Sequence, residues 1–316
     1  MSYWFTIASL TGINVILAYS AYISYMSDQV SIGQAAYFGI GAYTAASLTV
    51  LFNFDLFSAV VIGGFAGGLL SLICGIPTLR LKGYHFTIAT VAFAEAVRVI
   101  LHNTRYGRPR EEGGEGNRWL GPDGPVGFRH INYLNDNNIS TAEYALIIWF
   151  CVLIVVLLFV IIERSRISRL LRTIAEDEVV ARAIGISTSR LKVAAFVFGG
   201  VLAGVSGGLY AHLLTFISGS DFTIQLSVIV LAFVIIGGGQ TLWGPLLGAI
   251  IFTLLPELLR PIQGFRLEIF GLAILLTMLF RPSGAISAQT VRTLKAKFRR
   301  ADRPPPGVGE ISAKKR

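Results

Sequence analysis

The sequence predicts an all-α fold, a polytopic transmembrane helical bundle of about nine spans. Hydrophobic residues make up 53% of its 316 residues and charged residues only 14%, whereas soluble domains carry about 25% charged residues. The mean hydropathy is +0.65. The first Lys or Arg is Arg80, which argues against a secretory signal peptide, because that needs a positive N-terminal region. It also argues against a nucleic-acid-binding protein, despite the net charge of +9.

Uncharged or nearly uncharged runs recur along the chain. A helix needs ~20 apolar residues to cross the hydrocarbon core of a bilayer. The run 222–256 has 35 residues, too many for one crossing at ~1.5 Å per residue, and Gly237, Gly238, Gly239, Gly244 and Pro245 divide it into two. The nine predicted crossings are 3–26, 32–52, 56–78, 84–101, 144–162, 193–217, two within 222–256, and 265–280.

The distribution of basic residues predicts the orientation. Nineteen of the 27 Lys and Arg residues lie in three segments, 80–82, 163–192 and 281–316. Nine crossings place all three on one face, which the positive-inside rule assigns to the cytoplasm. The N-terminus and the long loop 102–141 are then outside. We expect a membrane domain over 1–281 and a basic, flexible cytoplasmic tail over 282–316.

Glycines at four-residue spacing predict closely packed and broken helices. They occur in rows within 63–68, 200–208 and 244–248. Small residues at this spacing let helix backbones approach each other in a membrane. The stretches 63–68 and 199–208 resemble each other and cross the membrane in opposite directions, as in transporters built from inverted repeats.

The residue types needed for catalysis or for metal binding do not cluster. Cys74 and Cys151 lie in apolar runs, and the four histidines show no ligand spacing. The sequence has no Gly-Lys dipeptide, so it contains no phosphate-binding loop of the P-loop type. We therefore predict no catalytic residues, no metal site and no cofactor in this chain. If it uses ATP, partner subunits must bind it.

The start of the second predicted span carries hydrogen-bonding side chains beside helix-weakening glycines. These residues are Ser31, Gln34, Tyr37, Gly39 and Gly41. Polar backbone is tolerated at membrane depth only where protein or a water-filled cavity satisfies it. We expect these residues to line a substrate path; the alternative is a polar helix entrance at the membrane interface.

Two charged residues lie inside the fourth predicted span. Glu95 and Arg98 are three residues apart, which places them on one helix face. Intramembrane charges usually face protein or a cavity. We predict a structural ion pair, with a direct role in transport as the alternative.

The basic segment 163–192 contains a short predicted helix. Acidic residues favour the start of a helix, and Gly is a common residue just after its end. We expect a docking helix over 175–185, with Ala181 and Gly185 small because a partner lies against them; the alternative is a solvated loop. Its named residues are Ala175, Glu176, Asp177, Glu178, Ala181 and Gly185.

Four stretches together resemble the M-type permease subunit of branched-chain amino acid ABC importers. They are SIGQAAYFGIGAYTAA (31–46), GYHFTIATVAFAEAVRVI (83–100), AEDEVVARAIGIS (175–187) and GGGQTLWGPLLGA (237–249). They occur in the family's order over about 11–281. Family members usually read SLGHAAF at 31–37, so Gln34 replaces a histidine and Tyr37 a phenylalanine.

The resemblance implies a non-enzymatic permease of a prokaryotic cytoplasmic (inner) membrane. Its implied partners are a second, related permease, two ATP-binding subunits that hold ATP and Mg, and an extracytoplasmic substrate-binding protein. Residues 175–185 would be the coupling helix to the ATP-binding subunits. The implied cargo is a branched-chain, hydrophobic amino acid, with urea, short amides or small organic acids as alternatives. An ion-coupled secondary transporter using Glu95 and Arg98 is the competing class, and a membrane-embedded enzyme is the weakest.

Overall fold

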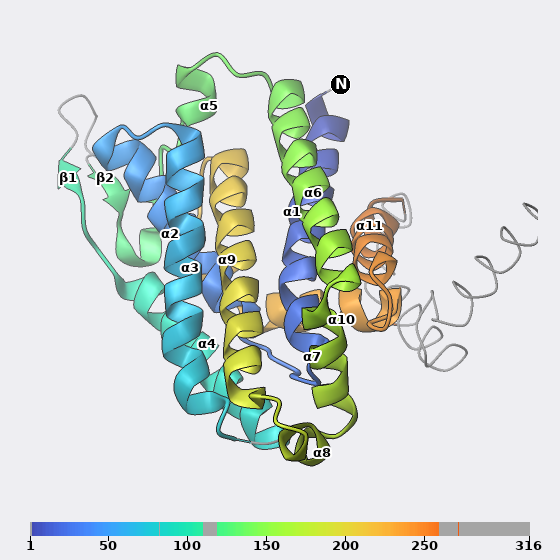
Figure 1. Cartoon of the computed structure of the whole chain (residues 1–316). Helices are drawn as coiled ribbons and strands as arrows, with labels where there is room; N and C mark the ends of the chain where they lie inside the picture. Colours follow the sequence, from blue (N-terminus) through green and yellow to red (C-terminus); the bar gives the residue numbers. More distant parts are fainter. Residues whose placement is uncertain (1, 82, 110–118, 259–270, 272–316) are drawn as a thin grey trace, which may run out of the picture.

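The computed structural model describes residues 2–81, 83–109, 119–258 and 271 of the chain. These residues form a bundle of long helices (Figure 1). Among the described residues, seven helices are long and apolar enough to cross a membrane, and an eighth apolar helix is shorter. The predicted ninth crossing at 265–280, Gly271 excepted, and the tail 282–316 lie outside the described residues. The prediction of a polytopic helical bundle is confirmed.

The long helices follow the predicted runs closely. The break inside 222–256 begins at Gly238, whose φ of +113° ends the preceding helix at Gly237, as glycine at such an end allows. The membrane-length segments are α1 (Ser2–Tyr25), α2 (Gln34–Phe52), α3 (Leu56–Thr78), α4 (Tyr84–Asn103), α6 (Thr141–Arg164), α9 (Thr188–Leu214) and η2 (Gly219–Asp221) with α10 (Ile224–Gly237); the shorter one is α11 (Trp243–Leu258).

The loop between α4 and α6 is not wholly irregular. It forms a small antiparallel sheet of β1 (Arg108–Pro109), β2 (Trp119–Pro122) and β3 (Phe128–Arg129), in that order, with η1 (Gly124–Val126) and α5 (Tyr133–Asp136). The amide of Phe128 donates to the carbonyl of Ile217 over 2.7 Å, and the amide of Ile217 donates back over 3.0 Å. These bonds tie the loop to the turn after α9.

Helices α2, α3 and α9 pack backbone against backbone. A Cβ atom built on Gly41 of α2 would lie 2.2 Å from the carbonyl oxygen of Gly204 in α9, and one on Gly204 would lie 2.5 Å from that of Gly63 in α3. Figure 1 shows α3 and α9 side by side and antiparallel. The predicted close approach of glycine rows is therefore observed, and the two similar glycine stretches, 63–68 and 199–208, meet each other.

Gly41→Ala tests this contact. The added methyl group has only backbone atoms to displace, so we expect the free energy of unfolding to fall by about 1–3 kcal/mol, the usual cost of overpacking. A lower thermal unfolding midpoint of the detergent-solubilised protein would show it. Phe65→Leu on α3, where Phe65 is 66% exposed, should change stability by less than about 0.5 kcal/mol. Equal midpoints for Gly41→Ala and wild type would contradict the packing.

Candidate functional site

The residues predicted to line a substrate path lie at a break between two helices. α1 ends at Tyr25 and α2 begins at Gln34, so residues 26–33 form a non-helical connector. Ser31 and Gln34 are 3% and 1% exposed. The Ser20 hydroxyl donates to Oε1 of Gln34 over 3.2 Å. The polar residues of the motif are thus enclosed by the bundle.

Side chains of neighbouring helices form hydrogen bonds with backbone groups of the connector and of the first turn of α2. The amide of Ile32 donates to Oγ1 of Thr90 over 3.2 Å, and the hydroxyl of Thr87 donates to the carbonyl of Val30 over 2.9 Å. Both threonines belong to α4. From α10, the hydroxyl of Ser227 accepts the amide of Ala35 at 2.9 Å. Side chains of the surrounding helices therefore hold an unwound segment in the interior.

Two buried polar atoms near the connector have no hydrogen-bond partner among the described residues. They are the hydroxyl of Ser24 and the amide oxygen of Gln29. Leaving such groups unpaired costs about 1–3 kcal/mol each, so the two together require an explanation. A bound polar molecule or water would satisfy them.

Gly39 and Gly41 are packing residues in this conformation. A Cβ atom on Gly39 would lie 2.9 Å from both Leu101 and Phe222, and Gly41 abuts Gly204. The motif thus separates into a polar part (Ser31, Gln34 and Tyr37) and two contact glycines. None of its residues lines either of the two cavities described below.

Glu95 and Arg98 form the predicted ion pair. Nε of Arg98 donates to both carboxylate oxygens of Glu95 at 2.9 Å. Their side chains are 39% and 25% exposed, respectively, in this chain. The pair is therefore real but lies at the surface of the bundle and is only partly enclosed.

The expected single helix 175–185 is in fact two helices. α7 (Arg166–Glu176) contains Ala175 and Glu176 at its C-terminal end, and α8 (Glu178–Ala183) follows at once. Asp177 separates them, because its backbone is extended and its Oδ1 accepts the amides of Val179 at 2.8 Å and Val180 at 3.1 Å. A side-chain cap of this kind starts a new helix.

Ala181 and Gly185 are small for reasons within the chain. Ala181 is fully buried, so a partner cannot touch it. Gly185 has a φ of +85°, and a Cβ built there would meet nothing within 4 Å; it ends α8 in the left-handed region that glycine favours. The expectation that a partner's surface makes these residues small is therefore wrong for Ala181, whereas contact of a partner with Gly185 stays a prediction.

Glu178 anchors α8 to α9. Its Oε2 accepts a hydrogen bond from Nζ of Lys192 at 2.9 Å, and its other oxygen pairs with Arg182. Partial burial alone would raise the pKa of Glu178, but the hydrogen bonds from Lys192 and Arg182 outweigh burial and lower this pKa below its ordinary value. The charged form is therefore the stable one at neutral pH.

Apolar side chains on and beside α8 point away from the chain. Val179 is 71% exposed, Val180 53% and Ile184 67%. Beside them is a cavity of about 1130 Å³, bounded by connector residues 27–30, the turn between α3 and α4, and α7, α8 and α9. We call Val179, Val180 and Ile184 the α8 surface. Exposed apolar groups beside a charged cavity are typical of a protein-binding site.

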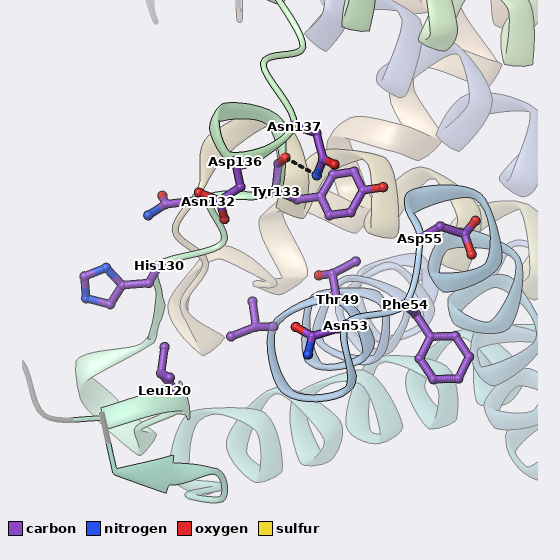
Figure 2. Close-up of a pocket in the computed structure, with 11 residues that line it drawn as sticks. Thr49, Asn53, Phe54, Asp55, Leu120, His130, Asn132, Tyr133, Asp136 and Asn137 are labelled. Atoms are coloured by element: carbon purple, nitrogen blue, oxygen red, sulfur yellow. Dashed lines mark hydrogen bonds between the residues drawn. The ribbon is translucent and has the colours of Figure 1, made fainter. Parts of the chain in front are cut away.

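A second cavity, of about 600 Å³, lies at the opposite end of the bundle, where α5 lies in Figure 1. Figure 2 shows Asn53 and Asp55 from the α2–α3 turn and Asn132 and Asp136 from around α5 on its walls. Hydrogen bonds from the Ser58 side chain and amide lower the pKa of Asp55, so this carboxylate is charged.

This second cavity was not predicted from the sequence. The available signal was the density of Asn and Asp in 132–138 between two spans. Behind it, Nε2 of the buried His212 lies 3.1 Å from Oγ1 of Thr49, and Tyr133 packs edge-on against the imidazole. Among the described residues, no three His, Cys, Asp or Glu side chains gather as a metal site.

Comparisons with known proteins agree with this architecture. The high-affinity branched-chain amino acid transport system permease protein LivM of Escherichia coli is 29% identical over 89% of this chain and 69% of its own length. The Salmonella typhimurium protein of the same name is 28% identical over the same shares. A probable branched-chain amino acid transport permease protein LivM of Methanocaldococcus jannaschii is 22% identical over 75% of this chain and 70% of its own length.

No solved structure matched the chain. The family described as the permease component of the branched-chain amino acid transport system matches residues 3–281. That match spans every described helix and both cavities. The chain therefore belongs to the branched-chain amino acid transport permease family, as a multi-pass membrane protein.

Proposed function

We propose that this chain is the membrane-spanning subunit of an ATP-driven importer of leucine, isoleucine and valine. The family match over residues 3–281 supports the cargo, and the relatives' names specify the same class of amino acid. The chain itself binds no cofactor in this proposal. Partner subunits bind ATP and Mg, and an extracytoplasmic binding protein delivers the amino acid.

The α8 surface is the observation that supports ATP coupling. Three branched apolar side chains gather at a six-residue helix and the residue after it, outside the membrane-length helices. An ion-coupled transporter acting alone has no use for such a surface. An ATP-binding subunit needs a contact surface on the permease through which it transmits its movement. We infer that Val179, Val180 and Ile184 contact that subunit.

The proposed orientation follows from the basic segments. The end of the bundle that carries α8 also holds Arg80 and the basic segment 163–192, so in this proposal it faces the cytoplasm. The α5 end and the N-terminus then face outward, and the polar cavity at that end lies where the binding protein docks. Residues 1–281 form the permease domain and 282–316 the basic cytoplasmic tail.

A push on α8 reaches the membrane through α9. Glu178 binds Lys192, and α9 packs against α2 and α3 through Gly204, Gly41 and Gly63. Packed backbones shift as units because they have no side chains between them to bend. ATP-driven movement of α8 therefore favours one arrangement of α2, α3 and α9 over another. The ATP-binding subunits can shift this equilibrium only by binding the two arrangements with different affinities.

The connector between α1 and α2 is the proposed substrate path. Ser31, Gln34 and Tyr37 are enclosed when α2, α3 and α9 are packed as observed. The amide oxygen of Gln29 and the hydroxyl of Ser24, neither of which has a hydrogen-bond partner among the described residues, would bind the ammonium and the carboxylate of an amino acid once the helices part. The Glu95–Arg98 pair is already internally neutralised, which weighs against its use as an ion-coupling site.

Val180→Asp tests the docking role of α8. A buried charge at a hot spot of an interface costs about 2 kcal/mol or more, so we expect the variant to bind the ATP-binding subunits about 30-fold more weakly. Stimulation of ATPase activity by loaded binding protein should fall in parallel. Co-purification and ATPase assays measure both.

Val126→Asp is the matched control for an added charge. Val126 is 48% exposed and lies in η1 of the loop between α4 and α6, outside both cavities, so this variant should retain the ATP-binding subunits. A substitution such as Gly185→Leu cannot serve as a test of docking. The φ of +85° at Gly185 strains any side chain there, so the variant would change the fold of α8 as well as its surface. If Val180→Asp retains the ATP-binding subunits as well as wild type does, α8 is not their docking site.

Glu178→Gln tests the anchor of α8 on α9. The lowered pKa of Glu178 means that the anchor's stabilisation is present above the ordinary Glu pKa and is lost as pH falls through the folded-state value. At pH 7 the amides of 179–184 should therefore exchange with solvent about fivefold faster in the variant, the factor for about 1 kcal/mol.

The comparison with wild type must be made at each pH, because intrinsic exchange rates change with pH. The ratio of variant to wild-type exchange rates should approach one as Glu178 becomes protonated. A ratio of one at pH 7 would show that Glu178 does not hold α8, and a ratio of about five that stays constant down to pH 3 would show that its charge plays no part.

A further inference from the structure

Two long helices of the bundle are poorly covered by the rest of the described chain. In the most apolar 18-residue window of α4 and of α6, only 28% of the residues are buried. α6 carries no charged residue between Tyr144 and Ile162, whereas α4 carries Glu95 and Arg98 within its length. Lipid is a suitable neighbour for α6. It is an unsuitable neighbour for α4, because charges in hydrocarbon are costly.

The Glu95–Arg98 pair lies in the middle part of α4 and not at a helix end. Glu95 is 11 residues from Tyr84 and 8 from Asn103, which is ~16 Å and ~12 Å at 1.5 Å per residue. Helical side chains lean toward the N-terminal end, and Arg98 accordingly binds Glu95, one turn closer to that end. Its guanidinium therefore points away from the nearer helix end and cannot reach the interface there.

The pair also retains unused hydrogen-bonding capacity. Arg98 donates to Glu95 through Nε and Nη2, and Nη1 makes no hydrogen bond to any described residue. No described residue outside the pair bonds either side chain. A guanidinium has five N–H donors and a carboxylate about four acceptor sites, so both groups can bind a further polar partner.

The surface around the pair has the shape for a close helix contact. Ile88, Ala92, Glu95, Ala96 and Val99 fall within one ~100° arc of α4 at 100° per residue; we call them the α4 face. Ala92 and Ala96 are exposed, and small residues four apart let a second helix approach closely. Ile88 is 66% and Val99 44% exposed, so larger apolar groups flank the alanines.

We propose that the α4 face is the contact surface for the second, related permease subunit of the importer. That subunit packs a helix across Ala92 and Ala96 and directs a polar side chain to the Glu95–Arg98 pair. The contact removes an ion pair from lipid and satisfies its remaining donors and acceptors. The inference rests on the proposed function, because a permease that acts alone has no such partner.

A photo-crosslinking amino acid at position 99 tests the contact in the assembled transporter. We expect a covalent adduct between this chain and the second permease subunit. The matched control is position 153 on α6, where Leu153 is 52% exposed; it should label lipid only. Lipid labelling alone at position 99, or an adduct between two copies of this chain, would overturn the proposal.

The same preparation separates this inference from the proposed function. If the ATP-binding subunits and the second permease co-purify while position 99 gives no adduct with that permease, the α4 face is misassigned and the importer stands. If the ATP-binding subunits co-purify without any second permease, the pairing and the α4 contact both fail. If no subunit co-purifies, the importer itself fails.

Neutralising the pair gives an independent measurement. Arg98→Gln leaves Glu95 as an unpaired charge at the contact, so we expect at least tenfold less second permease to co-purify. The double variant Glu95→Gln with Arg98→Gln should recover to within about threefold of wild type. Leu153→Gln, the polar control on α6, should assemble normally. Normal assembly of Arg98→Gln would contradict the proposal.

Discussion

The direct backbone contact among α2, α3 and α9 at Gly41, Gly63 and Gly204 is the constraint on which the rest of this structure depends. Inside a membrane the hydrophobic effect does not drive helices together, so close packing must hold them. The contact fixes α2, and with it the connector 26–33 that precedes α2. It also fixes α9, which carries Lys192 and therefore α8. The polar interior and the α8 surface are thus mechanically connected.

The exposed surfaces of the bundle divide by chemistry. Between Tyr144 and Ile162, α6 carries no charged side chain and suits lipid, whereas the α4 face carries an ion pair and the α8 surface carries apolar groups beside charged residues. A surface whose polarity does not match its surroundings indicates a missing neighbour. The chain therefore has the character of one part of a larger assembly, in agreement with its membership of a transport-system permease family.

Much of the bundle was predictable because hydrophobic length, glycine breaks and glycine rows are local signals. The Glu95–Arg98 pair was predictable from its three-residue spacing. The split at Asp177 was not predicted. An aspartate can lie within a helix or cap the start of a new one, and the sequence alone does not show which of the two occurs. The cavity around Asn53 and Asp136 was also missed, since it joins residues 53–55 to residues 130–137, which lie far apart in the sequence. Which face of α4 the chain leaves uncovered depends on tertiary packing, which a single sequence does not encode locally.

In the proposed importer, ATP hydrolysis by partner subunits drives this permease. The most direct measurement is uptake of labelled leucine into proteoliposomes that contain the chain, its second permease, the ATP-binding subunits and the loaded binding protein. Uptake should require ATP inside the cytoplasmic compartment and persist when proton and sodium gradients are collapsed. Leucine uptake by the purified chain alone, driven by an ion gradient without ATP, would contradict the account.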